Sequence, residues 1–196
     1  MEEKIKQNEV IEEKHLELRM YFFTIYQLTG IQKGIQCGHA ALEYAAKYWD
    51  NTEYLDFIKN WKTWIILNGG TTNDEIDINE NTVGTLNQIG DKLNENEINF
   101  SFFREPDLNN SLTALCFILD ERVFNKKEYP DFIDFYIERQ NINNSLKNDE
   151  LRIILEGCTN DEIREYYNND YKEWVRSLGG LKNVFLRELI SGKKLA

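Results

Sequence analysis

The stretch 112–120, "LTALCFILD", is apolar at almost every position. A strand with one solvated face alternates apolar and polar residues, whereas a near-continuous apolar strand is buried on both faces. This run therefore predicts a strand inside a sheet that other elements cover on both sides. The stretch 18–28, "LRMYFFTIYQL", is rich in aromatic and β-preferring residues and predicts a second buried strand.

The periodicity of apolar residues predicts the remaining elements of this sheet. Two further strands are expected at 62–70 and 99–108, and three helices at 35–50, 52–61 and 82–98. The resulting order is β-α-α-β-α-β-β, which predicts an α/β fold with a mixed four-stranded sheet flanked by helices.

Three regions of different character predict the domain organisation. Residues 1–16 are expected to form a polar helical arm, and residues 17–122 the α/β domain. After residue 122 every apolar pattern has helical spacing, so 123–196 predicts a helical extension. We expect this extension to serve as a lid or as an oligomerisation element, with a homodimer through 123–196 as one form.

Charge and cysteine usage limit the partners and the compartment. The net charge is -11, and residues 1–122 hold most of it, with 11 Lys and Arg against 21 Asp and Glu. Such a surface repels nucleic acid at long range, because proteins grip phosphates with Lys and Arg. The three cysteines are odd in number and lie in apolar patterns, which predicts buried thiols in a reducing compartment.

The chain is expected to be cytoplasmic and to have no membrane partner. It has no apolar run of about 18 residues, and its first residues lack the apolar centre of a secretory signal. The abundance of Asn, Lys, Glu and Ile suggests an AT-rich genome such as that of a phage. No cofactor and no metal site are expected, and none of the three cysteines has metal-ligand spacing.

Polar residues follow three of the predicted strands, at 29–39, at 68–70 and at 103–113. Ligands of α/β sheets gather outside the carboxyl ends of strands, where loops and helix N-termini meet. The first place combines a loop bearing Lys33 with a helix start near Gln36, which suits a carbonyl or phosphate oxygen.

Residues 36–42, "QCGHAAL", together with Gly34, resemble the peptidyl-tRNA hydrolase family of the archaeal and eukaryotic type. That family's segment reads roughly G-K-x-A-A-Q-C-S-H-A-A, after a first strand. Its later R-D-A-G loop and threonine-containing last strand are matched here by 104–107, "REPD", and by Thr113. The resemblance covers about residues 18–122 and implies the same strand order.

The resemblance implies hydrolysis of the ester bond of peptidyl- or aminoacyl-tRNA. Lys33 would polarise the ester carbonyl, and Glu105 or Asp107 would orient the attacking water. The present chain departs from the family pattern, because the family's lysine aligns with Gln32, one place before Lys33. Within a helix this shift would turn the side chain by about 100°.

Each candidate residue has a functional and a structural interpretation. Lys33 either binds an anion or is an exposed loop lysine. Arg104 either forms a charge cluster with Glu105 and Asp107 that orients a ligand, or it forms a structural ion pair at the end of a strand. His39 either transfers a proton and contacts ligand beside Gln36, or packs beneath the Lys33 loop and braces it. The remaining candidate ligand-binding residues are Gln32, Asn68, Gly69, Asn109, Asn110 and Thr113. For Asn68 and Gly69, and for Asn109 and Asn110, the structural interpretation is a tight turn.

Three functions stay open. We favour a diverged protein that binds a nucleotide-like small molecule between loop 29–39 and loop 104–113 without the family's catalysis. The displaced lysine and the acidic domain favour this over the alternative of an active peptidyl-tRNA hydrolase. The third hypothesis is a protein-interaction module that uses the helical extension.

Overall fold

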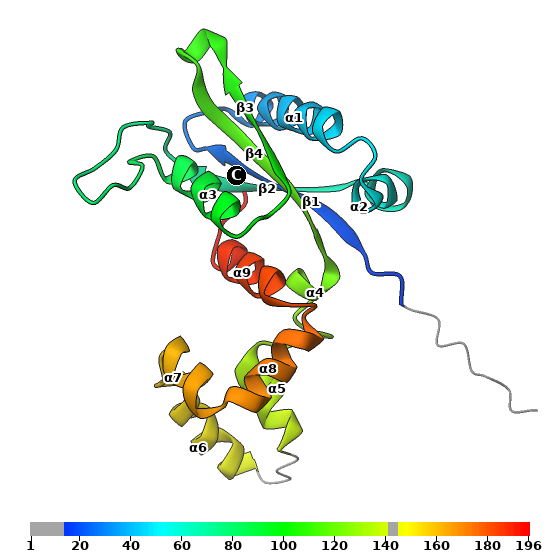
Figure 1. Ribbon diagram of the computed structural model, residues 1–196, viewed down its shortest axis with the longest axis vertical. Helices are drawn as coiled ribbons and strands as arrows, with labels where there is room; N and C mark the ends of the chain where they lie inside the picture. Colours follow the sequence, from blue (N-terminus) through cyan, green and yellow to red (C-terminus); the bar gives the residue numbers. More distant parts are fainter. Residues whose placement is uncertain (1–13, 141–144) are drawn as a thin grey trace, which may run out of the picture.

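A mixed four-stranded sheet forms the centre of the upper half of the molecule (Figure 1). The computed structural model describes residues 14–140 and 145–196. The strand order is β2-β1-β4-β3, in which β2 runs parallel to β1 and the other two neighbouring pairs are antiparallel. The strands are β1 (Leu18–Ile25), β2 (Thr63–Gly70), β3 (Phe100–Glu105) and β4 (Ser111–Asp120). The predicted α/β class and the mixed four-stranded sheet are confirmed.

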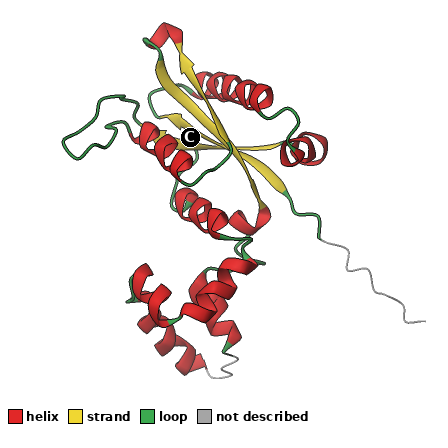
Figure 2. Cartoon of the chain, in the orientation of Figure 1, coloured by secondary structure: helices red, strands yellow, loops and turns green. Residues whose placement is uncertain are grey.

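Helices cover both faces of this sheet (Figure 2). On one face Met20 and Phe22 of β1 pack with Cys37, Ala40 and Tyr44, which belong to helix α1 (Gly30–Lys47). The same side holds the short helix α2 (Thr52–Asp56) and the π-helical turn η1 (Phe57–Trp61).

The opposite face is covered by two helices that lie far apart in the sequence. Leu86 and Leu93 of α3 (Thr85–Glu95) and Leu186 of α9 (Leu181–Ile190) pack against Phe23 and Phe117 of the sheet. Strand β4 is buried at every position from 112 to 119, because it pairs on both edges and is covered on both faces. Burial on both faces is the reason why the sequence of β4 is apolar at almost every position.

Helix α1 begins five residues earlier than the predicted helix at 35–50. Thr29 caps it, since its hydroxyl accepts from the Gln32 amide while the Gln32 side chain accepts from the Thr29 amide. This reciprocal capping box starts a helix even though Gly30 and Gly34 lower the local helix propensity. The expectation that Lys33 lies in a loop is therefore wrong, because Lys33 lies in the first turns of α1.

After β4 the chain enters a helical region, as predicted for 123–196. The short helix α4 (Glu121–Phe124) leads into a bundle of four helices, which lies at the lower end of the molecule (Figure 1). An aromatic cluster of Phe132, Tyr167, Tyr171 and Trp174 holds much of this bundle together. The four helices are α5 (Phe132–Arg139), α6 (Ser145–Glu156), α7 (Asn160–Tyr166) and α8 (Asn168–Ser177).

The last sixteen residues return to the sheet, so the division expected at residue 122 separates segments that pack together. Helix α9 is joined to the segment after α4 by Arg187, whose buried guanidinium donates to the Asp131 carboxylate at 2.7 Å and to the Arg122 carbonyl at 2.9 Å. The bundle α5–α8 is thus inserted between two parts of one α/β unit.

The C-terminal residues pair with the outer edge of β2. The Asn68 amide donates to the Lys194 carbonyl at 2.9 Å, and the Ala196 amide donates to the Ile66 carbonyl at 3.0 Å. An open strand edge is a template for unwanted pairing, and this tail covers part of the β2 edge. Figure 1 places the C-terminus beside the sheet.

The predicted polar arm at 1–16 is described only in its last three residues. Residues 1–13 lie outside the described part of the chain, and residues 14–16 are not helical. The Lys14 ammonium lies against the carboxylates of Glu121 and Glu128, which ties the start of the described chain to the α4 region.

Candidate functional site

The three polar regions predicted from the sequence do meet at one end of the sheet. Strand β1 ends at Ile25 opposite Gly70, the last residue of β2. Strand β3 ends at Glu105, which pairs with Ser111 at the start of β4. The N-terminus of α1 follows the end of β1, so all of these chain ends lie at the same edge. Topology therefore brings the candidates to one place, as expected for an α/β sheet.

A buried amide forms the centre of this place. Gln36 is 6 % exposed, and its Nε2 donates to Oε2 of Glu105 at 2.6 Å. Its Oε1 accepts from the hydroxyl of Thr113 at 2.6 Å. Because the nitrogen faces a carboxylate and the oxygen faces a hydroxyl, the amide has one favourable orientation. The structure brings together Gln36, Glu105 and Thr113, which we call the Gln36 site.

Lys33 lies one helical turn before this amide. Residues three and four apart share a helix face, so Lys33 is on the face of α1 that carries Gln36 and Cys37. The Lys33 side chain is half-buried, and within the described chain its ammonium has no hydrogen-bond or ion-pair partner. No acidic residue occupies the first turn of α1. An unpaired cation thus stands beside the Gln36 site at the positive end of a helix.

Gln32 does not take part in this arrangement. Its Oε1 accepts from the Thr29 amide at 3.0 Å and from the Thr29 hydroxyl at 2.9 Å, so the side chain is used as a cap. The family's lysine aligns with Gln32, and Lys33 is the next residue. Gln32 caps the start of α1, whereas the Lys33 ammonium has no partner within the described chain.

Arg104 is engaged on the other side of the sheet. Its guanidinium donates to both carboxylate oxygens of Asp74, at 2.8 and 2.9 Å, and to the carbonyl of Asn110 at 3.0 Å. Hydrogen bonds from Arg104 lower the pKa of Asp74 below its ordinary value. The charge cluster of Arg104 with Glu105 and Asp107 is therefore not formed. Arg104 and Glu105 are successive residues of β3, and successive side chains of a strand point to opposite faces.

The sequence alone does not identify two residues of the Arg104 contact, Asp74 and Asn87. Asp74 lies in the acidic loop after β2, and the buried Asn87 of α3 donates to it at 2.6 Å. The sequence signals the acidic loop but not its partner, because Asp74 and Arg104 are thirty residues apart.

The loop candidates build a turn instead of lining a cavity. Asn109 and Asn110 have φ values of 55° and 58°, the left-handed region that Asn tolerates better than most residues. They follow the 3-10 turn η2 (Pro106–Leu108) and reverse the chain into β4. Asp107 is exposed, and its backbone amide donates to Glu105 at 3.5 Å.

Asn68 and Gly69 also have structural roles. The Asn68 Oδ1 accepts from the Gly70 amide at 2.8 Å and shapes the end of β2. A side chain at Gly69 would come within 2.6 Å of Leu86 Cδ1 and 3.2 Å of Phe23 Cβ. Gly69 is thus required by the packing of α3 on the sheet.

His39 is exposed and does not brace a loop. Its ring stacks on Phe103 of β3, with centroids 4.4 Å apart and planes at 24°. The expected packing beneath the Lys33 loop is wrong, because that segment is helical and His39 lies two turns further along α1.

The cysteines are free thiols, and two of them are buried as predicted. Cys37 and Cys116 are fully buried, and burial raises the pKa of Cys37 to about 12. Cys158 is half-buried. A thiol with a raised pKa is a poor nucleophile, so Cys37 has a packing role.

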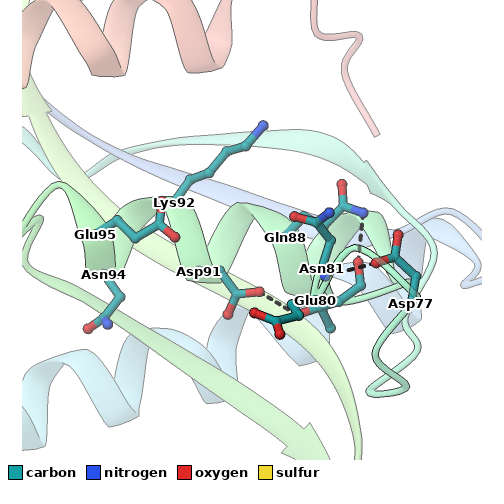
Figure 3. Close-up of a pocket in the computed structure, with 9 residues that line it drawn as sticks. Asp77, Glu80, Asn81, Gln88, Asp91, Lys92, Asn94 and Glu95 are labelled. Carbon is teal, nitrogen blue, oxygen red and sulfur yellow. Dashed lines mark hydrogen bonds between the residues drawn. The ribbon is translucent and has the colours of Figure 1, made fainter.

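Two hollows lie on the α3 side of the sheet. One, of about 650 Å³, lies between α3 and the loop before it and is lined by polar side chains such as Asp77, Glu80 and Asp91 (Figure 3). The other, of about 350 Å³, has Phe102 on its floor and the Arg104–Asp74 pair at its rim. Neither hollow contains Lys33 or Gln36.

No model of a known protein family matches this chain, and no curated protein sequence matches it either. Among residues 14–140 and 145–196, the His, Cys, Asp and Glu side chains form no group of three suited to a metal ion. In the same ranges, no helix combines the length and apolar character needed to cross a bilayer.

Proposed function

We propose that the chain binds a small nucleotide-like molecule at the Gln36 site, beside Lys33. The observation that carries this proposal is the 2.6 Å hydrogen bond between the buried Gln36 amide of α1 and Glu105, the last residue of β3. It holds a carboxylate in a fixed position before any ligand arrives. Preorganised polar groups of this kind lose little entropy on binding.

The two charged groups suit different parts of such a ligand. The free ammonium of Lys33, near the positive end of α1, complements a phosphate group. The Glu105 carboxylate is an acceptor only, so it complements the hydroxyls of a ribose or the amino group of a base. A neutral ligand would use only half of this arrangement.

The charge distribution favours a small ligand over a long nucleic acid. Residues 1–122 carry 11 cationic and 21 acidic side chains, so a polyanion is repelled while a single phosphate next to Lys33 is not. Binding at contact distance is screened only weakly by salt, and binding of a long RNA falls steeply as salt rises.

The test is calorimetric titration of the full chain with AMP, GMP, CMP and UMP. We expect binding of at least one nucleotide, and a loss of about tenfold in affinity in Lys33→Ala and in Glu105→Gln, since each removes one charge-assisted contact. Glu105→Gln keeps an acceptor for the Gln36 amide, so the fold is preserved. Asp107→Asn is the matched control, because Asp107 is exposed on the adjacent turn and has no role in the proposed contact.

Two results would overturn the proposal. One is the absence of heat with all four nucleotides at millimolar concentration. The other is equal weakening in Asp107→Asn and Glu105→Gln, which would mean that general charge and not the fixed carboxylate determines binding.

Hydrolysis of peptidyl-tRNA is the second candidate. One observation favours it: Gln36, Glu105 and Thr113, three residues matched by the resemblance to the peptidyl-tRNA hydrolase family, are in hydrogen-bond contact. The helical position of Lys33 weighs against it, because the family's lysine aligns with Gln32, whose side chain caps α1. In that mechanism Lys33 polarises the ester carbonyl and Glu105 or Asp107 orients the water.

This candidate has its own assay. Purified protein is incubated with an N-acylated aminoacyl-tRNA, beside Lys33→Ala and Asp107→Ala variants. Turnover that is lost in either variant supports the hydrolase. No turnover at micromolar enzyme leaves the nucleotide binder as the proposal.

A further inference from the structure

A groove with an apolar floor and a cationic rim lies on the surface of the helical bundle. It occupies about 430 Å³ and runs between α7, α8 and the start of α9. Tyr171, Val175 and Leu181 supply the apolar surface, and Leu181 is 67 % exposed. We call it the basic groove.

The rim of the basic groove is positively charged although the chain as a whole is acidic. Arg164, Lys172 and Arg176 line it, and no carboxylate does. Within the described residues, the side chains of Lys172 and Arg176 have no ion-pair partner. Arg164 donates from its Nε to the Tyr171 hydroxyl at 3.3 Å and forms an ion pair with Asp161 at 3.5 Å. The unpaired cations of Lys172 and Arg176 beside an apolar surface fit a partner that is both acidic and apolar.

The chain itself contains a segment that is both acidic and apolar. The loop between β2 and α3 contains Glu75, Asp77 and Glu80, and Ile78 at its tip is 99 % exposed. We call residues 75–80 the acidic tip. Exposure of one isoleucine is ordinary on a protein surface, but here it lies between carboxylates at the end of a protruding loop.

The acidic tip is held in shape before any contact forms. The Asp77 carboxylate accepts from the backbone amides of Asn79 at 2.8 Å and of Asn81 at 2.9 Å, and the Asp77 amide donates to the Asn81 carbonyl. A rigid loop loses little entropy when it inserts into a groove. Behind it, the hollow shown in Figure 3 adds the carboxylates of Asp91 and Glu95.

The two surfaces lie too far apart to meet within one molecule. Figure 1 shows the loop between β2 and α3 projecting beside the sheet in the upper half of the molecule, whereas α7 and α8 lie in the lower half, beyond α9. Contact between them requires two copies.

We propose that the acidic tip of one copy inserts into the basic groove of a second copy, with Ile78 against Tyr171, Val175 and Leu181. The contact joins different surfaces of the two copies, so it repeats head to tail or closes into a ring. Lys172 and Arg176 pair with the carboxylates of the tip. Each copy has a net charge of -11, so the association is weak and is strengthened by locally opposite charge.

Sedimentation equilibrium of the full chain tests the contact. We expect the mean mass to rise above that of one chain with increasing concentration at about 50 mM salt, and to fall again at about 500 mM salt, where surface charges are screened. The tip variant is Ile78→Asn with Glu80→Gln. The groove variant is Lys172→Glu with Arg176→Glu. All four residues are exposed, so both variants should keep the melting temperature of the parent chain.

Each variant alone should associate at least about tenfold more weakly than the parent chain. An equimolar mixture should form one-to-one pairs, because it combines one intact groove with one intact tip. The control for charge is Lys59→Glu with Lys127→Glu, two exposed lysines away from both surfaces, which should associate like the parent chain.

Three results would overturn the proposal. The first is a parent chain of single-chain mass at every concentration. The second is association of either variant alone as strong as that of the parent chain, which would place the contact elsewhere. The third is a mixture of the two variants that stays unassociated.

Discussion

At the scale of single residues, a buried tyrosine hydroxyl without a partner stands out. Tyr44 is fully buried between α1 and the sheet, and its hydroxyl has no hydrogen-bond partner among residues 14–140 and 145–196. A buried polar group that leaves water without finding a partner costs free energy. On the same helix Tyr48 differs, because its hydroxyl donates to the Phe100 carbonyl at 3.2 Å.

Tyr44→Phe should therefore be neutral or should raise the free energy of unfolding by about 1 kcal/mol. Tyr48→Phe removes a made hydrogen bond and should lower it by about 1 kcal/mol. Urea denaturation of both variants measures the difference. A Tyr44→Phe variant less stable than Tyr48→Phe would show that the Tyr44 hydroxyl is satisfied in solution.

Glu53, on α2, makes the free energy of unfolding depend on pH. Burial, with a smaller contribution from Asp120, raises the pKa of Glu53 from about 4.5 to about 7. The folded state therefore holds a proton that the unfolded state has lost between those pH values. This contribution to stability is fully present below about pH 4.5 and is lost as pH rises through 7, by about 3 kcal/mol at most.

Glu53→Gln removes this dependence, because glutamine is neutral at every pH. The variant should melt at a higher temperature than the parent chain at pH 8 and should lose that advantage by pH 5. Melting curves of both chains at several pH values measure it. A constant difference between them would mean that Glu53 has an ordinary pKa.

At the scale of elements, the sequence predicts best where a single physical cause acts along a whole segment. The start of the predicted strand at 112–120 differs from that of β4 by one residue and the ends coincide, because every position from 112 to 119 is buried. The predicted start of α1 at residue 35 is five residues late, because the capping box of Thr29 and Gln32 starts the helix at Gly30. That capping box was visible in the sequence and would have corrected the prediction.

The contacts of the candidate site also differ in how far the sequence predicts them. The convergence of Gln36, Glu105 and Thr113 follows from topology, so the sequence could predict it. The pair of Arg104 with Asp74 and the tail on β2 depend on contacts between distant segments. No local pattern encodes such contacts, so the sequence allows a structural ion pair of Arg104 but does not identify Asp74 as its partner.

Arg187 connects α9 to the segments that follow β4. It is 4 % exposed, and it bonds the Asp131 carboxylate and two backbone carbonyls. Arg187→Lys keeps the charge but cannot reach three acceptors, so we expect a loss of about 2 to 4 kcal/mol in the free energy of unfolding. Arg176→Lys, at an exposed position, should cost little. Chemical denaturation distinguishes the two, and equal effects would contradict this role.

At the scale of the whole molecule, the helical bundle is an insertion. A side chain at Gly179 would lie 2.4 Å from the Arg122 guanidinium carbon, so the chain leaves the α/β unit and returns to it at the same place. Leu186 completes the core on the α3 side of the sheet.

A chain in which residues 132–178 are replaced by a short Gly-Ser linker should therefore fold and melt cooperatively. A chain that stops after residue 131 should not fold, because it lacks α9 and the tail that pairs with β2. Circular dichroism and thermal melting of the two chains test this. Cooperative melting of the shorter chain would show that the first 131 residues are sufficient.

This insertion also determines when the protein can finish folding as a ribosome makes it. All four strands of the sheet have been synthesised by residue 120, but helix α9, which completes their core, begins only at residue 181, and the segment that covers the β2 edge extends to residue 196, 76 residues after the end of β4. At ordinary rates of translation this interval lasts roughly 4 to 15 seconds. During that time the nascent sheet exposes an apolar face and a bare β2 edge, while the bundle between them can already fold from local contacts. A protein of this design is most vulnerable to aggregation before α9 and the residues after it have been synthesised, and a chaperone that acts on nascent chains should raise its yield.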